Sequence, residues 1–124
     1  MRIVLIIFFG GGIGSMSRYL VNRWATGLIT SAFPYGTFLV NMIGCFLIGF
    51  LVFFTERLGA NALNWRLFLV TGFCGGFTTF SSFSFENVQL ISAHQLFIML
   101  IYSAGSIALG LFATYIGILL ARNI

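Results

Sequence analysis

Four long apolar runs, which together contain a single charged residue, dominate this sequence. The runs cover residues 3–21, 38–55, 67–85 and 96–121. Each is close to the roughly 20 mostly apolar residues that a helix needs to cross a bilayer. Allowing for polar ends, we expect spans at 3–23, 35–56, 65–89 and 95–121 in one membrane domain, 1–124. The pattern predicts an all-α integral membrane protein with four transmembrane helices.

The composition excludes the other broad classes of protein. Charged residues make up 6% of the chain, whereas soluble domains carry about a quarter. Aromatic residues make up 18%, which is more apolar surface than a disordered chain leaves in water. The first run lacks the small-residue cleavage pattern of a secretory signal, so we expect it to be a retained helix.

All six basic residues are arginines, and most lie near the ends of the predicted spans. One side of the membrane would carry Arg2, Arg57, Arg66 and Arg122, and the other Arg18 and Arg23. Membrane proteins are oriented by an excess of basic residues on the cytoplasmic side, and four against two is a weak excess. We therefore expect the chain to insert in either direction. The net charge of +4 then belongs to solvated flanks, and we expect no nucleic-acid partner.

The sequence offers little for catalysis. It contains no Asp, and its one histidine, His94, lies in a predicted loop. Glu56 and Glu86 lie near predicted helix ends, where we expect them to be solvated or to extend toward the membrane surface. No nucleophile has a plausible base and orienting partner. Cys45 and Cys74 fall inside predicted spans, where we expect free packing residues rather than a disulfide or a metal site.

Small residues in the apolar runs favour close helix packing. The stretch 10–14 is rich in glycine but lacks the Lys and Ser/Thr of a phosphate-binding loop. Gly10 and Gly14 instead form a small-xxx-small pair that lets helices approach. Similar positions are Gly44, Gly49, Ser106 and Gly110. Four helices of this length surround little of a pathway by themselves, so we predict a homodimer.

The third run contains the most informative segment, residues 71–86. Paired glycines, Gly75 and Gly76, precede paired threonines, Thr78 and Thr79, and both residue types are poor in a helix interior. We therefore predict a break at mid-membrane. Broken backbone at that depth must be buried in protein or line an aqueous cavity, and the hydroxyls of Thr78, Thr79 and Ser81 are candidates to bond the freed groups.

A broken helix presents groups for ions of both signs. The end of its first half offers carbonyl oxygens, which suit a hard cation, and the start of its second half offers amides, which suit an anion. Phe80 and Phe83 share a face, with Ser84 near them, and aromatic edges carry partial positive charge that suits a small anion. A phenylalanine face packed on lipid or on a neighbouring helix is the alternative.

Two further polar residues have two interpretations each. Asn41, just inside the second run, either lines a wet pathway or bonds between helices. Arg18 either attracts anions to a vestibule or extends its guanidinium to the membrane surface. The residues by themselves leave both questions open.

The sequence resembles the Fluc (CrcB) fluoride channel family in three motifs. The first is Gly14 with Arg18 and Tyr19, and the second is P-x-G-T-x-x-V-N at residues 34–41. The third is T-G-F-x-G-G-x-T-T-F-S-x-F-S-x-E at residues 71–86, which is highly specific. Ser82 stands where many members have Thr, a change that keeps the hydroxyl.

The resemblance implies an antiparallel, dual-topology homodimer with two fluoride pathways. It also implies a structural sodium ion at the dimer centre, held by the backbone carbonyls of Gly75 and Thr78. The fourth run matches less sharply and contributes only Ser106. The pathway residues predicted in this way are Arg18, Asn41, Thr79, Phe80, Phe83, Ser84 and Ser106.

The function implied is passive fluoride export across the bacterial inner membrane, which gives fluoride resistance. Fluoride is costly to dehydrate, so selection would depend on donors and aromatic edges that replace its water shell. One alternative is a small dual-topology multidrug/proton antiporter, which needs a carboxylate inside the membrane and would depend on Glu86. A non-transporting assembly subunit is the other, although it gives the broken third span no purpose.

Overall fold

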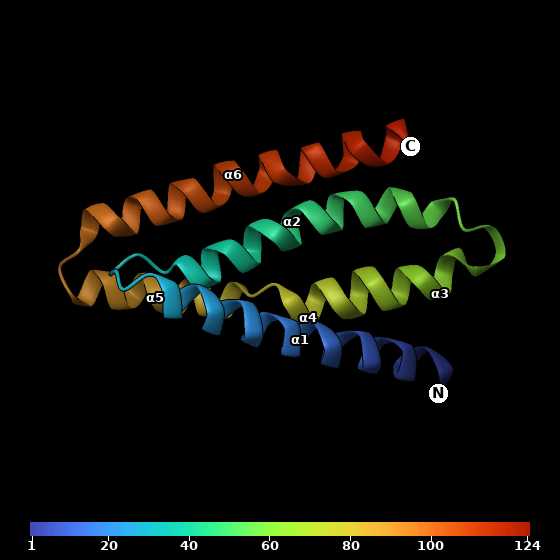
Figure 1. Ribbon diagram of the computed structural model, residues 1–124, viewed down its shortest axis with the longest axis horizontal. Helices are drawn as coiled ribbons and strands as arrows, with labels where there is room; N and C mark the ends of the chain where they lie inside the picture. The colour runs from blue at the N-terminus through green and yellow to red at the C-terminus, as the bar shows by residue number, and fades with distance from the viewer.

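The computed structural model describes all 124 residues and is entirely helical. Four stretches are long and apolar enough to cross a membrane, as the sequence predicted. Three of them are continuous helices: α1 (Arg2–Leu28), α2 (Tyr35–Glu56) and α6 (Leu96–Asn123). The helices run up and down along one long axis, and both termini lie at the same end (Figure 1).

The third span, Gly59–Ser92, is divided into segments. A 3-10 turn, η1 (Gly59–Asn61), and the short α3 (Ala62–Arg66) lead into wide π-helical turns, η2 (Leu67–Cys74). The last turn, α4 (Gly75–Phe77), is followed by two extended residues and then by α5 (Phe80–Ser92). Thr78 has φ −77° and ψ 157°, and Thr79 has φ −149° and ψ 114°. The predicted break is therefore confirmed at the two threonines.

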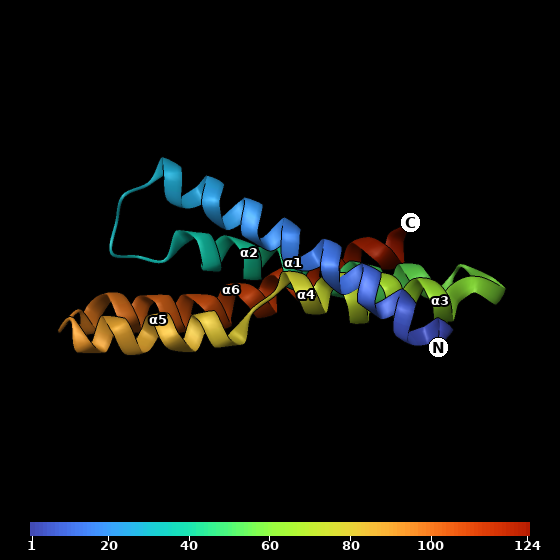
Figure 2. The ribbon, with the colours of Figure 1, turned by 90° about the horizontal axis from the view of Figure 1, so that it is seen from below.

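The break changes the neighbours of the third span. Before it, η2 and α4 pack against α1, whereas after it α5 packs mainly against α6. Helix α2 contacts α1, α6 and the segments of the third span. Figure 2 shows the chain crossing over at the break, with α5 beside α6. The break thus places the start of α5 near Asn41, in the first half of α2.

Glycines allow α1 to meet the third span backbone to backbone. A Cβ on Gly14 would lie 2.2 Å from the Phe73 carbonyl oxygen, and a Cβ on Gly10 would lie 2.4 Å from that of Phe68. Gly12, on the same helix, has nothing within 4 Å of its Cβ position. The predicted packing role of Gly10 and Gly14 is confirmed, within one chain.

The same device joins α2 to α6. A Cβ on Gly49 would lie 2.2 Å from the Thr114 carbonyl oxygen, and a Cβ on Gly117 would lie 2.3 Å from that of Phe46. Gly110 makes looser contact, with Cys45 and Met42 3.4 and 3.5 Å from its Cβ position. These glycines have no side chain where α2 and α6 cross, and the two backbones can therefore approach closely.

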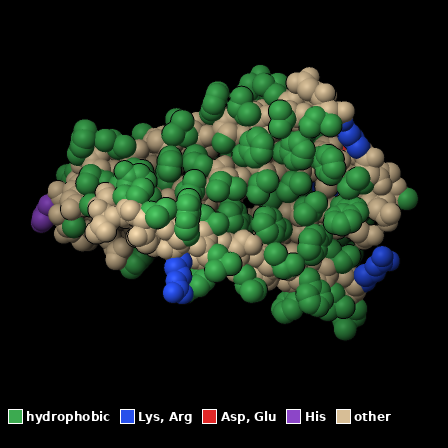
Figure 3. All heavy atoms as spheres, in the orientation of Figure 1, with side chains coloured by type: hydrophobic (Ala, Val, Ile, Leu, Met, Phe, Trp, Pro, Cys, Tyr) green, Lys and Arg blue, Asp and Glu red, His purple; other side chains and the backbone are tan.

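The molecule buries little of itself: 18 of 124 residues are buried. Hydrophobic side chains cover most of the visible face, with basic side chains at its edges and the histidine at one end (Figure 3). This surface suits a lipid environment or a second protein, because exposed apolar area of this extent is not stable in water. His94 lies in the exposed turn before α6, with φ 55°, as expected for a loop residue.

Candidate functional site

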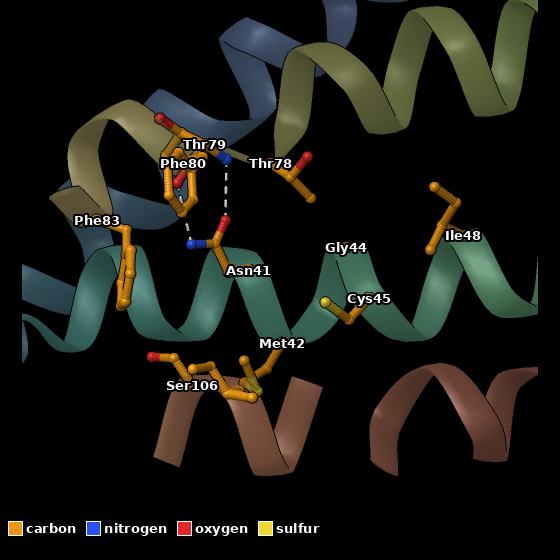
Figure 4. Close-up of a pocket in the computed structure, with 11 residues that line it drawn as sticks. Asn41, Met42, Gly44, Cys45, Ile48, Thr78, Thr79, Phe80, Phe83 and Ser106 are labelled. Carbon is orange, nitrogen blue, oxygen red and sulfur yellow. Dashed lines mark hydrogen bonds between the residues drawn. The ribbon is translucent and has the colours of Figure 1, made fainter. Parts of the chain in front are cut away.

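The centre of the site is the pair of bonds between α2 and the broken backbone. The Asn41 side-chain nitrogen (Nδ2) donates to the Thr79 backbone carbonyl oxygen at 3.1 Å, and the Thr79 backbone N–H donates to the Asn41 side-chain oxygen (Oδ1) at 2.9 Å. Figure 4 shows both bonds, with Asn41 on α2 directly facing the break. Of the two interpretations of Asn41, interhelical bonding is thus observed.

Hydroxyls satisfy further groups at the break. The Thr78 hydroxyl donates to the Cys74 carbonyl oxygen at 2.9 Å. The Thr79 hydroxyl caps α5, because it accepts from the Ser82 backbone N–H at 3.2 Å, which replaces a bond that the first helical turn lacks. Ser81 reaches only the Thr79 hydroxyl, at 3.2 Å. The expected role of these hydroxyls is therefore confirmed for the two threonines and not for Ser81.

Helix α1 approaches the break from its other side. The Ser15 hydroxyl and the Arg18 guanidinium donate to the carbonyl oxygens of Gly76 and Thr78, each at 3.4 Å. Arg18 is half-buried and turns toward the protein rather than toward the membrane surface. On the α2 side, Gly44 makes room for Thr78, since a Cβ there would lie 2.1 Å from the Thr78 methyl carbon.

An open hollow of about 330 Å³ lies between α2, the break and α6. Phe80 and Phe83 lie side by side at its wall, with ring centroids 5.8 Å apart. The hollow brings together five of the predicted pathway residues, with apolar and sulfur-containing side chains around them (Figure 4). The five are Asn41, Thr79, Phe80, Phe83 and Ser106. The predicted residues Ser84 and Arg18 do not line it.

Arg18 lines a second, polar hollow of about 590 Å³ between α1 and the start of α5. Arg23 and Asn22 lie in the same wall, opposite the hydroxyls of Ser81 and Ser82. These groups are donors, and the hollow contains no carboxylate. Thr79 lines both the basic and the aromatic hollow.

Glu86 is not the solvated carboxylate that the sequence led us to expect. It lies six residues before the end of α5 and is half-buried. Its two oxygens accept hydrogen bonds from the hydroxyl of Thr37 in α2, at 2.6 Å, and from the hydroxyl of Tyr102 in α6, at 2.7 Å. Thr37 and Tyr102 are 1% and 0% exposed. The expectation was wrong for Glu86, because residues distant in sequence cover it, and right for Glu56, which is exposed.

Sequence reasoning missed Thr37 and Tyr102 as partners of this carboxylate. The available signal was that a carboxylate near an apolar run needs hydrogen-bond donors. Thr37 and Tyr102 lie near the starts of their own runs, which makes their hydroxyls candidates. Phe33 and Phe83 enclose Tyr102, with ring centroids at 5.3 and 5.1 Å. A third hollow, lined by Glu86 and the turn residues, opens beside this network.

The predicted cation ligands flank α4, since Gly75 is its first residue and Thr78 follows its last. Gly75 is exposed and has nothing within 4 Å of its Cβ position, and it lines neither of the two larger hollows. The Thr78 carbonyl oxygen already accepts from Arg18. Cys45 and Cys74 are free thiols, as expected.

The arrangement suits the weak binding of a small anion rather than a reaction. The two hollows offer N–H and O–H donors and aromatic rings, and neither contains a carboxylate or an imidazole. Ring edges and neutral donors replace part of an anion's hydration shell without the grip of a buried ion pair.

Comparisons with known proteins identify the family of this chain. The model of the CrcB-like protein family, Camphor Resistance (CrcB), matches residues 5–118. A "Fluoride-specific ion channel FluC" from Flavobacterium psychrophilum is 41% identical over 124 residues, the full length of both chains. Proteins of the same name from Oceanobacillus iheyensis and Chlorobium luteolum are 45% identical over 121 residues and 47% identical over 119 residues. These alignments cover 98% and 96% of this chain and 92% of each relative.

The match covers all four spans at identities well above those of chance similarity. It includes the broken third span and the residues that line the two hollows. The chain is therefore a multi-pass membrane protein of the CrcB-like family, a family of fluoride ion channels and not of enzymes.

Proposed function

We propose that this protein is a fluoride-selective channel that lets cytoplasmic fluoride leave the cell passively and so gives fluoride resistance. The observation that carries the proposal is the aromatic hollow, where Phe80 and Phe83 lie beside the Asn41–Thr79 bonds at the break. Relatives named as fluoride-specific channels support the same ion. A bacterial inner membrane is the expected location, because fluoride must leave the cytoplasm there.

The proposed route begins in the basic hollow at Arg18 and continues past Thr79 to the two rings. Arginine and hydroxyl donors raise the local anion concentration, and the rings and amides then replace part of the hydration shell. Ser106 belongs to the same hollow. Ser84, which is half-buried on α5 and lines neither hollow, is proposed as a pathway residue only in the assembled dimer.

The proposal includes an antiparallel homodimer. Phe80 is 78% exposed in the single chain, so one wall of its hollow is missing, and a second copy would supply it. Gly75 has open space where its side chain would be, which leaves room for close approach of a partner. The arginine count of four against two is a weak enough bias to allow both orientations.

A sodium ion at the dimer centre is part of the same proposal. The carbonyls of Gly75 and Thr78 are the hard oxygen ligands that such an ion prefers, and they flank α4, which follows the π-helical turns. Each chain supplies two carbonyls, so a two-fold pair of chains would surround the ion with four. The Thr78 carbonyl oxygen also accepts from Arg18, so the ion would share this oxygen with the guanidinium.

Fluoride efflux from proteoliposomes, measured with a fluoride electrode, tests the proposed function. We expect rapid fluoride efflux and little chloride efflux, and equal passage of chloride would reject selectivity. Phe80→Ile and Phe83→Ile should sharply reduce flux while the protein still assembles, with Phe97→Ile, an exposed α6 residue, as the control. Unchanged flux in both variants would reject the aromatic pathway.

Orientation and sodium are tested separately from flux. If the dimer is antiparallel, protease added outside sealed vesicles should remove a C-terminal tag from about half of the chains, whereas complete removal or complete protection would reject it. The midpoint of thermal unfolding should rise when N-methylglucamine is replaced by sodium, because a ligand of the native state stabilises it. An unchanged midpoint would reject the ion and leave the fluoride proposal standing.

The rival antiporter function depends on Glu86, because exchange chemistry needs an embedded carboxylate. Both oxygens of Glu86 are occupied by hydroxyl donors, and the basic and aromatic hollows contain no carboxylate. A cationic drug would meet Arg18 and Arg23 in the polar chamber. Drug-dependent proton movement in the same vesicles would favour the antiporter over the channel.

A further inference from the structure

Helix α5 carries both rings of the aromatic hollow, yet few contacts fix its orientation. It follows the two extended residues of the break, so its start is not held by a continuous helix. Only one of its residues, Leu90, is buried. Apolar packing therefore specifies its rotation weakly, and directional bonds to α6 and α2 must do so.

Two neighbouring residues of α5 bond to two neighbouring residues of α6. Glu86 accepts from the Tyr102 hydroxyl, as described above. The side-chain oxygen of Asn87 (Oδ1) accepts from the Ser103 hydroxyl at 2.7 Å. Asn87 and Ser103 are both half-buried, so water competes little for this bond.

Asn87 also acts directly on the backbone that carries a ring. Its amide nitrogen donates to the Phe83 carbonyl oxygen, one turn earlier in α5, at 2.8 Å. The same side chain therefore joins α6 to Phe83, with its oxygen toward Ser103 and its nitrogen toward the ring-bearing residue. The orientation of the Asn87 side-chain amide is defined, because its nitrogen must donate to the Phe83 carbonyl oxygen, which leaves its oxygen to accept from the Ser103 hydroxyl.

We propose that Asn87 and Ser103 are a positioning pair that sets the rotation of α5 and thereby places the Phe83 ring in the aromatic hollow. The pair touches no ion and acts through Phe83. The inference rests on the proposed fluoride pathway for its functional consequence, whereas its structural part, the placement of the ring, stands without it. Neither residue belongs to the predicted pathway.

The test follows the ring and the flux separately. 4-Fluorophenylalanine at position 83 gives a fluorine NMR signal that reports the surroundings of the ring, and the same label at the exposed Phe97 is the control probe. Ser103→Ala and Asn87→Leu should shift or broaden the signal at 83 and leave that at 97 unchanged. Ser103→Thr, which keeps the hydroxyl, should restore it.

Fluoride efflux and fluoride-to-chloride selectivity should fall together in Ser103→Ala and Asn87→Leu, each by about three- to tenfold, the range that interhelical side-chain bonds in membranes support. The double variant should be no worse than Asn87→Leu alone, because that change already removes the bond that Ser103→Ala removes. Ser92→Ala is the matched control, since Ser92 bonds only within α5, to the Val88 carbonyl oxygen, and is exposed.

Ser103→Ala removes a single oxygen and is the decisive variant if Asn87→Leu fails to assemble. An unmoved signal at 83 in Ser103→Ala, or additive effects of the two variants, would overturn the proposal. A moved signal in a protein that carries no fluoride at all would uphold the positioning pair and reject the proposed function.

Discussion

Asn41 and Thr79 exchange two hydrogen bonds, so that one side chain of α2 satisfies both backbone groups of an extended residue inside the membrane span. Thr79 is 8% exposed, and water does not replace these bonds. The break is consequently a defined structure held by its own chain. The side-chain amide of Asn41 offsets the cost of breaking the helix, because its donor and its acceptor pair with the C=O and the N–H of Thr79.

Replacing Asn41 by Leu should destabilise the fold by about 2 kcal/mol or more, because it leaves a buried N–H and a buried C=O without partners. The measurement is the free energy of unfolding in detergent. Asn123→Leu, at the exposed end of α6, is the control and should change stability little. Equal effects of the two variants would show that the bonds to Thr79 contribute nothing.

Gly44→Ala should displace the break, because the added Cβ would lie 2.1 Å from the Thr78 methyl carbon. We expect a loss of about 1–3 kcal/mol, as for other overpacked positions. The second change Thr78→Ser removes that methyl group and should restore most of the stability, as measured by thermal unfolding. Failure of the double variant to recover would mean that Thr78 is not the group displaced.

Gly14→Ala should be severe and Gly12→Ala mild, although the two residues lie on the same helix. The Cβ at 14 would meet the Phe73 carbonyl oxygen and the Phe77 backbone nitrogen, at 2.2 and 2.9 Å, whereas the Cβ at 12 meets nothing. A backbone contact has no rotamer by which to yield, so α1 must move away from α4. Yield of folded monodisperse protein would reveal the difference, and comparable yields would contradict the packing argument.

Glu86→Ala should cost about 2 kcal/mol or more, because it orphans the buried hydroxyls of Thr37 and Tyr102. Glu56→Ala should stay within about 1 kcal/mol, since its pair with Arg66 is long, at 3.8 Å, and exposed. Stability measured at low and high salt checks both, because only the exposed pair is screened. A salt-dependent loss at Glu86 would argue for a solvated carboxylate after all.

Features that depend on neighbouring residues could be predicted from the sequence. The apolar runs specify helices that cross a membrane, because their length matches the bilayer and their charges lie near the ends. The break was predictable for the same reason, since paired glycines and threonines weaken a helix wherever it packs. The shared face of Phe80 and Phe83 follows from helical periodicity, and the structure confirms it.

Features that depend on distant residues could not be predicted in this way. Asn41 had two equal interpretations, because its partner lies 38 residues away in the chain. Glu86 was expected to be solvated, and its two donors come from α2 and α6. Ser84 shares a turn with Phe80 and yet lines neither of the two larger hollows, because periodicity specifies a face and not what covers it.

The sequence by itself determined that this chain is a four-span membrane protein with a broken third helix and an aromatic pair after the break. Those properties are local, and hydrophobicity, helix propensity and spacing are enough to specify them. The tertiary structure decided which groups satisfy the break and which carboxylate is covered, as well as the division into a basic and an aromatic hollow at Thr79. Inside a membrane each freed polar group needs a protein partner, and only the packing of α1, α2 and α6 around the break supplies it.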